Sequence, residues 1–165
     1  MAQVYVSVGS NIDRESMVRS GFSALNNAFT QLVKSSVYES IAVGFEGDNF
    51  YNLVVGFEAS DPHQVAHTLR DIEQAHGRHR GEKKFAPRTL DLDLLLYDHE
   101  DLHDQGLDVP RAEITRYAFV LGPLAEIAPQ ELHPELRKPY AQLWSEFCVN
   151  NPAEADSIWP VTFAW

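Results

Sequence analysis

The first part of the chain joins a strand-like hydrophobic pattern to a helical one. Residues 4–8, Val-Tyr-Val-Ser-Val, alternate in character and predict a strand that ends at the turn-forming residues 9–11. Hydrophobic residues then recur at helical spacing between positions 17 and 29. Asp13 is the expected N-cap of this helix.

Two further strands are predicted over residues 31–39 and 50–57. The loop at 41–49 between them is rich in glycine, aspartate and asparagine, and it is too short to hold a crossover helix. An antiparallel or mixed sheet with helices packed on it is therefore expected.

Helix signals return in the middle of the chain. Asp61 followed by Pro62 predicts a helix start, and Gly77 predicts its end. The residues expected to form its buried stripe are Val65, Leu69 and Ile72. Residues 90–97 then predict another strand.

The C-terminal part is harder to interpret because prolines interrupt it. Short helices are predicted over 111–117 and 118–127, and a further helix over 139–147. Neither a linker nor a repeat is visible, so we expect one domain over residues 1–165, with 130–165 as a weakly assigned tail.

Charge is distributed unevenly along the chain. Thirteen Lys and Arg against 24 Asp and Glu give a net charge of −11, which argues against a nucleic-acid-binding protein. Residues 78–88, however, hold five basic residues and one acid. A local cationic stretch on an acidic protein indicates a small anionic ligand, because screening over roughly 8 Å separates it from distant acids.

Other features restrict the protein class. The single cysteine, Cys148, excludes an internal disulfide framework. No apolar run approaches the length of a membrane span, and no signal peptide is visible. We therefore expect a cytoplasmic monomer that binds neither nucleic acid nor membrane.

The most specific motif is residues 87–97, Pro-Arg-Thr-Leu-Asp-Leu-Asp-Leu-Leu-Leu-Tyr. In a strand, Asp91 and Asp93 share one face about 6–7 Å apart, and their mutual repulsion is about 3 kcal/mol at a dielectric constant near 20. A hard cation such as Mg²⁺ relieves that repulsion; a solvated outer face is the alternative. The residues expected to face the core are Leu90, Leu92, Leu94 and Leu96.

The basic stretch beside this strand favours the cation. Carboxylates for a divalent ion next to arginines for phosphate oxygens are the groups that phosphoryl-type transfer requires. Three weaker features are residues 9–11, Asn52 and Phe119, which suit a close ligand, a heterocycle edge and ring stacking, respectively. Each is also compatible with an ordinary turn, a satisfied polar group or a core aromatic.

In this order and spacing the segments resemble the hydroxymethyl-dihydropterin pyrophosphokinase family of bacterial folate synthesis. The resemblance runs from about Val4 to Pro129, and residues 87–97 match the family motif almost residue for residue. It implies a ferredoxin-like α+β core with a mostly antiparallel sheet. It also implies transfer of the β,γ-pyrophosphate of ATP to the pterin hydroxymethyl group, leaving AMP.

The same resemblance implies roles for individual residues. Two Mg²⁺ ions would be held by Asp91 and Asp93, and the catalytic arginines would be Arg78 and Arg88. The residues implied for ATP are Glu73, Arg80, Arg88, Leu94 and Arg111. Those implied for the pterin are Ser40, Val43, Phe50, Asn52 and Phe119.

The chain departs from the family pattern at three positions. Phe85 stands where the family usually has tryptophan, Arg111 where it has histidine, and Tyr117 where it has arginine, with Arg116 one step before. A non-catalytic or altered-substrate paralogue that binds pterin or nucleotide is therefore the alternative function. An RNA-binding ferredoxin-like domain is disfavoured by the acidic charge.

Overall fold

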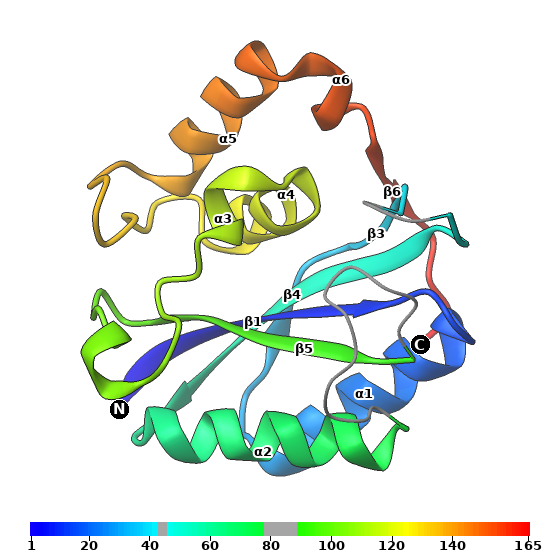
Figure 1. Ribbon diagram of the computed structural model, residues 1–165, viewed down its shortest axis with the longest axis vertical. Coiled ribbons are helices and arrows are strands. Elements are labelled where there is room, and N and C mark those ends of the chain that lie inside the picture. Colours follow the sequence, from blue (N-terminus) through cyan, green and yellow to red (C-terminus); the bar gives the residue numbers. More distant parts are fainter. Residues whose placement is uncertain (43–45, 78–88) are drawn as a thin grey trace.

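A six-stranded sheet with helices on both faces forms the framework of the computed structural model, which describes residues 1–42, 46–77 and 89–165 (Figure 1). The strands are β1 (Ala2–Ser10), β2 (Val33–Lys34), β3 (Val37–Ser40), β4 (Phe50–Ala59), β5 (Asp91–Tyr97) and β6 (Ile158–Val161). The helices are α1 (Arg14–Ala28), α2 (Pro62–Ala75), α3 (Glu113–Arg116), α4 (Ala118–Ile127), α5 (Tyr140–Asn150), α6 (Pro152–Ala155) and a 3-10 turn, η1 (His103–Gln105).

The strands run in the order β5-β1-β4-β3-β6, with β2 also paired to β4. Every pairing is antiparallel, which confirms the prediction of an α+β fold with a mostly antiparallel sheet. Within the described ranges, none of the helices has the length and apolar character needed to cross a membrane.

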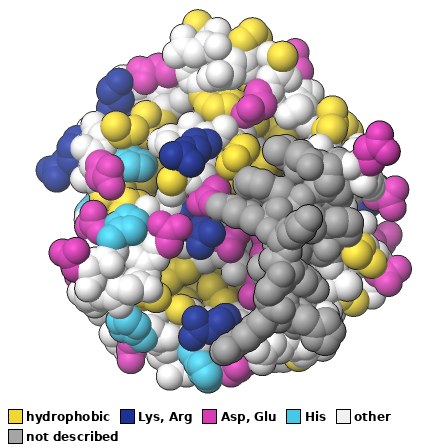
Figure 2. Space-filling view, viewed as in Figure 1, with side chains coloured by type: hydrophobic (Ala, Val, Ile, Leu, Met, Phe, Trp, Pro, Cys, Tyr) yellow, Lys and Arg dark blue, Asp and Glu magenta, His cyan; other side chains and the backbone are white. Residues whose placement is uncertain are grey.

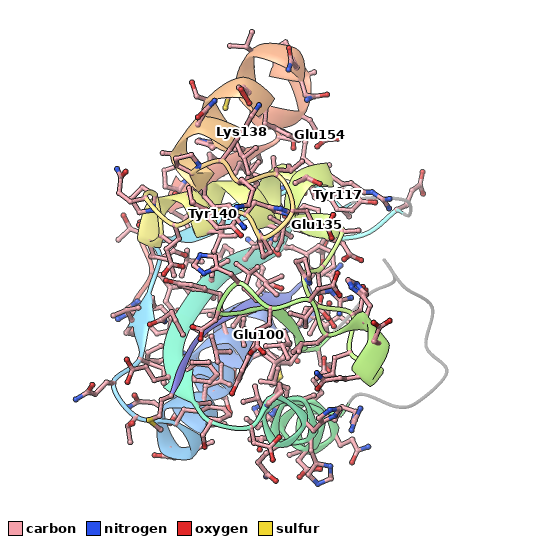
Figure 3. All side chains as sticks on the ribbon, turned by 90° about the vertical axis from the view of Figure 1, so that its left-hand side faces the viewer. Glu100, Tyr117, Glu135, Lys138, Tyr140 and Glu154 are labelled. Atoms are coloured by element: carbon pink, nitrogen blue, oxygen red, sulfur yellow. The ribbon has the colours of Figure 1, made fainter. Side chains whose placement is uncertain are left out.

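Two hydrophobic cores lie on opposite faces of the sheet. Helices α1 and α2 cover the lower face in Figure 1, and α3, α4 and α5 lie above the upper face. The side view in Figure 3 shows the same layers, with Tyr117 and Tyr140 in the upper one. Residues of β1 alternate between the two cores, since Val4, Val6 and Val8 belong to the lower core and Tyr5 to the upper one. The period-two pattern of the first strand is thereby confirmed.

The predicted ends of α2 are confirmed. At the start of α1 the predicted N-cap residue is present, but it does not cap the helix through its side chain. The Asp61 carboxylate accepts hydrogen bonds from the backbone N–H groups of His63 and Gln64, and Gly77 follows the helix at φ 93°. Asp13 precedes α1 as predicted, but its backbone is left-handed and its side chain makes no capping hydrogen bond. The prediction of Asp13 as the N-cap residue is confirmed by its position, and the side chain takes no part in the cap.

The region predicted as one strand over 31–39 is two short strands, β2 and β3. Between them the Ser35 hydroxyl accepts the backbone N–H of Val54 at 3.0 Å, so a side chain replaces a backbone partner there. The tail holds more regular structure than the single helix predicted there. The helix expected over 139–147 is α5, and β6 pairs with β3 at the far edge of the sheet.

One position of the leucine alternation in β5 was predicted wrongly. Leu90, Leu92 and Leu94 lie in the lower core as expected, but Leu96 belongs to the upper core. The pairing of β1 with β5 shifts between Tyr5 and Val6. Such a bulge places an extra residue in one strand and reverses the faces of the residues beyond it.

Truncation of a core residue on α1 tests the lower core. Val18 is fully buried there, so Val18→Ala is expected to lower the free energy of unfolding by about 2 kcal/mol. Urea unfolding measures the change, and Ser23→Ala on the exposed face of the same helix serves as the control. Equal stabilities of the two variants would contradict this packing.

Candidate active site

Two carboxylates project from the upper face of the edge strand β5. Asp91 and Asp93 are half-buried, while Leu92 between them is buried. Asp91 pairs with Gly9 and Asp93 with Ser7 of β1. Since paired residues in an antiparallel sheet share a face, both aspartates lie on the side opposite the lower core. The prediction that they share one face is confirmed.

A guanidinium group lies beside these carboxylates. Arg111 Nη2 is 3.7 Å from Asp93 Oδ1, and Arg111 Nε donates to Glu113 Oε2 at 3.2 Å. Burial alone would lower the pKa of the Arg111 guanidinium, but the charges of Asp93 and Glu113 outweigh it and raise that pKa. Arg111 is therefore a fixed cation at the site. Acidic and basic side chains stand together near the middle of the face shown in Figure 2.

Glu73 of α2 holds the outer edge of the same strand. Its side chain is 7% exposed, and Oε2 accepts the backbone N–H of Leu92 at 2.8 Å. This bond joins α2 to β5 at Leu92, the residue between the two aspartates in sequence. The place of Glu73 on the nucleotide side stays a prediction.

A second polar cluster lies on the same face two strands away. Asn52 and Ser40 are 7% and 2% exposed, and Asn52 Nδ2 donates to Ser40 Oγ at 2.5 Å. Phe50 shares their face because it is two residues from Asn52 and pairs with Ser40. The structure thus brings together three of the residues predicted to bind the pterin.

Gly9 joins the two clusters. It pairs with Asn52 on one side and with Asp91 on the other, so these three residues form one row across the sheet. With strands about 4.8 Å apart, the backbones of Asn52 and Asp91 are separated by about 10 Å. A Cβ atom at Gly9 would lie 3.0 Å from Asn52 Oδ1, which explains the glycine: a side chain there would fill the space between the clusters.

Phe119 lies on α4, above this face of the sheet. Its ring is partly buried against the upper core and stacks on Tyr117 at 5.2 Å, with 26° between the planes. Phe119 on the helix layer and Phe50 on the sheet thus belong to the same side of the sheet.

Some predicted site residues are not brought together here. Arg78, Arg80, Arg88 and Val43 lie outside the described residues. The Leu94 side chain lies in the lower core at 6% exposure, facing away from the aspartates.

Sequence reasoning missed Ser7 and Glu113. Ser7 is half-buried in the middle of β1, opposite Asp93, and Glu113 holds Arg111. The period-two pattern of the first strand could have placed Ser7 on the aspartate face. Nothing in the sequence indicated the pairing of Glu113 with Arg111.

Comparison with known proteins agrees with these observations. The model of the 7,8-dihydro-6-hydroxymethylpterin-pyrophosphokinase (HPPK) family matches residues 5–129. The 2-amino-4-hydroxy-6-hydroxymethyldihydropteridine pyrophosphokinase of Aquifex aeolicus is 37% identical over 150 residues, covering 88% of this chain and 92% of that protein. The Bacillus subtilis protein of the same name is 39% identical over 131 residues, covering 76% of this chain and 78% of that protein.

Solved structures extend the comparison to the fold. Wild-type Plasmodium falciparum HPPK-DHPS with SDX-DHP superposes with a TM-score of 0.69 at 12% identity. The match covers 97% of this chain and 47% of the other, so this chain spans about half the length of that protein. An HPPK-DHPS in complex with substrates gives a TM-score of 0.71 at 10% identity, covering 94% and 45% of the two chains. The prediction of a ferredoxin-like α+β core is confirmed.

Proposed function

The chain belongs to the 7,8-dihydro-6-hydroxymethylpterin-pyrophosphokinase family, and from this premise we propose the roles that its residues take in the reaction. It is an ATP-dependent pyrophosphokinase of folate biosynthesis. Pyrophosphate is transferred from ATP to the hydroxymethyl group of 6-hydroxymethyl-7,8-dihydropterin, and AMP is released. We further propose that the chain acts as a single-domain cytoplasmic monomer on these two small molecules.

The carboxylates of Asp91 and Asp93 suit Mg²⁺, on which this reaction generally depends. Both are hard oxygen donors, half-buried on one face. In residues 1–42, 46–77 and 89–165, no group of three or more His, Cys, Asp or Glu side chains forms a metal site. Mg²⁺ commonly takes one or two carboxylates and completes its shell with water and substrate phosphates. As the family resemblance implies, Asp91 and Asp93 would hold two Mg²⁺ ions, which would neutralise charge on the triphosphate.

The ATP phosphates would lie along β5 beside Arg111. Its guanidinium can bind phosphate oxygens in the bidentate geometry that arginine favours. Glu73 would line the nucleotide side. The ATP roles inferred from the resemblance for Arg80 and Arg88, and the catalytic roles of Arg78 and Arg88, remain predictions. The Leu94 side chain faces the lower core, away from this site.

The pterin would bind between the aromatic rings of Phe50 and Phe119. The amide of Asn52, supported by Ser40, would pair with the edge of the ring, since an amide offers a donor and an acceptor together. Val43 remains a prediction for the same site. The row formed by Asn52, Gly9 and Asp91 is the observation that supports this proposal, because it brings the residue proposed for the pterin near a carboxylate proposed for the metal.

Transfer then depends on alignment rather than on a covalent intermediate. The pterin hydroxyl oxygen attacks the β-phosphorus of ATP, the bond from that phosphorus to the oxygen bridging the α-phosphate breaks, and AMP leaves. Holding the reactants in line and neutralising the phosphate charge would supply most of the acceleration.

The departure at Arg111 predicts a measurable difference between two arginines. Arg111 is half-buried beside Asp93, whereas Arg116 is exposed. Arg111→Gln is therefore expected to raise the KM for Mg-ATP about tenfold, and Arg116→Gln to change it less than about twofold. Steady-state kinetics at saturating pterin measure both. A larger effect at Arg116 than at Arg111 would contradict the proposal that Arg111 binds the ATP phosphates.

An assay of AMP release tests the function itself. AMP formation from Mg-ATP should require the pterin alcohol and exceed that of an Asp93→Ala control. Isothermal titration calorimetry tests the alternative of a non-catalytic paralogue, which the departures at Tyr117 and Arg111 raise. Tight binding of both ligands without AMP would support that alternative and contradict the enzymatic proposal.

A further inference from the structure

A compact group of polar contacts lies on the lower face of the sheet, at the start of β4, the strand that carries Phe50 and Asn52. Arg14, the first residue of α1, lies with its guanidinium carbon 3.9 Å from the centre of the Tyr51 ring. Its Nη1 is 3.2 Å from Glu39 Oε2 and donates to the Asn49 carbonyl at 3.0 Å. Asn49 Nδ2 donates to the same Glu39 oxygen at 3.0 Å. One guanidinium thus contacts a ring, a carboxylate and a backbone carbonyl.

This cluster cannot touch the pterin site directly. Tyr51 pairs with Glu39 and packs against the lower core. Phe50 and Asn52, on either side of Tyr51, point to the upper face. Arg14 therefore holds the residues that flank the two predicted pterin contacts, from the opposite side of the sheet.

We propose that Arg14 is a positioning residue that fixes Asn49 and Tyr51 and thereby sets the orientation of Phe50 and Asn52 for the pterin. The inference rests on the proposed pterin roles of Phe50 and Asn52. Catalysis of this kind depends on geometry held within about half an ångström by supporting contacts. A small shift of the Phe50–Asn52 segment is enough to weaken the ring contacts.

The charges in the cluster favour its formation. Hydrogen bonding from Asn49 and the cation of Arg14 lower the pKa of the Glu39 carboxyl, so Glu39 is anionic at neutral pH. A second tie acts on the same loop, since Asn11 Nδ2 donates to the Asp48 carbonyl at 3.1 Å. Phe163 of the tail meets the Tyr51 ring edge-on at 5.8 Å. Asp48 and Asn49, which directly precede β4, are thus bonded to Asn11 and Arg14.

Arg14 can be changed without opening a cavity in the hydrophobic core. Its side chain is 29% exposed, and it borders an open surface hollow of about 930 Å³ whose lining includes Asp13, Glu39, Asp48 and Tyr51. Water can enter the space that a shorter side chain leaves. Loss of the contacts can therefore be separated from loss of the fold.

Calorimetry and kinetics on single variants test the proposal. Arg14→Gln is expected to raise the Kd and the KM for the pterin about tenfold, with the Kd for a Mg-ATP analogue within about twofold of wild type. Arg14→Lys should restore part of the affinity, because lysine can pair with Glu39 but lacks the planar fork. Arg70→Gln on the exposed face of α2 is the matched control and should match wild type.

The outcomes separate this inference from the proposed function. The positioning role is overturned if Arg14→Gln binds the pterin with wild-type affinity. It is also overturned if the variant loses affinity for the pterin and for the Mg-ATP analogue to the same extent. Absence of AMP release by wild type overturns the proposed function instead. In that case the pterin Kd of Arg14→Gln still reports on Arg14, because binding is measured without turnover.

Discussion

Replacing Asp93 with asparagine is expected to lower the rate of AMP release about a thousandfold, with little change in stability. The substitution keeps the size of the side chain and removes one of the negative charges proposed to hold Mg²⁺. Charge stabilisation in a partly buried site typically contributes factors of this order. Asp93 also faces Arg111, so its loss disturbs the phosphate side of the site as well. AMP release is measured at saturating Mg-ATP and pterin.

Asp104→Asn, a substitution of the same kind on the exposed η1 turn, is the matched control and should retain full activity. Raising the magnesium concentration should recover part of the loss in Asp93→Asn, because the weakened ligand set needs more free ion. Activity within tenfold of wild type would show that Asp93 is not a metal ligand for the reaction.

Replacing Asn52 with leucine is expected to raise the KM for the pterin about a hundredfold while leaving the Kd for a Mg-ATP analogue unchanged. Leucine keeps the branched side-chain shape, with a larger volume, but can neither donate nor accept, so the heterocycle edge loses its partners at a buried position. Pterin titration by calorimetry and steady-state kinetics measure the effect. Asn27→Leu on the exposed face of α1 is the control.

A thermal unfolding scan accompanies the Asn52 variant, because Ser40 loses the amide that donates to it. We expect weaker pterin binding in a protein that still unfolds near the wild-type temperature. Weakening of ATP binding to the same extent would contradict the assignment of Asn52 to the pterin.

Much of the framework followed from local patterns. The alternation of Val4, Val6 and Val8 and the Asp-Leu-Asp pattern at 91–93 placed side chains on the correct faces, because a strand permits only two directions. Asp61 and Gly77 marked α2 because their chemistry is specific to helix ends. The paired aspartates could be recognised because aspartate is rare in strands, so two on one face indicate a function.

The remaining errors arose where long-range contacts override local pattern. The bulge that turns Leu96 to the upper core depends on how β5 meets β1, and the break between β2 and β3 depends on the bond from Val54 to Ser35. Arg14 could not be recognised because its partners Glu39 and Asn49 are far from it in sequence. Only the folded sheet brings them together.

A crystal structure with Mg²⁺, the pterin alcohol and an ATP analogue that cannot be cleaved between the α- and β-phosphates tests the assignment most directly. We expect magnesium bound to oxygens of both Asp91 and Asp93, with Arg111 on a phosphate oxygen. The pterin should lie between Phe50 and Phe119, with Asn52 at its edge. A triphosphate whose magnesium contacts neither aspartate would contradict the proposed active site.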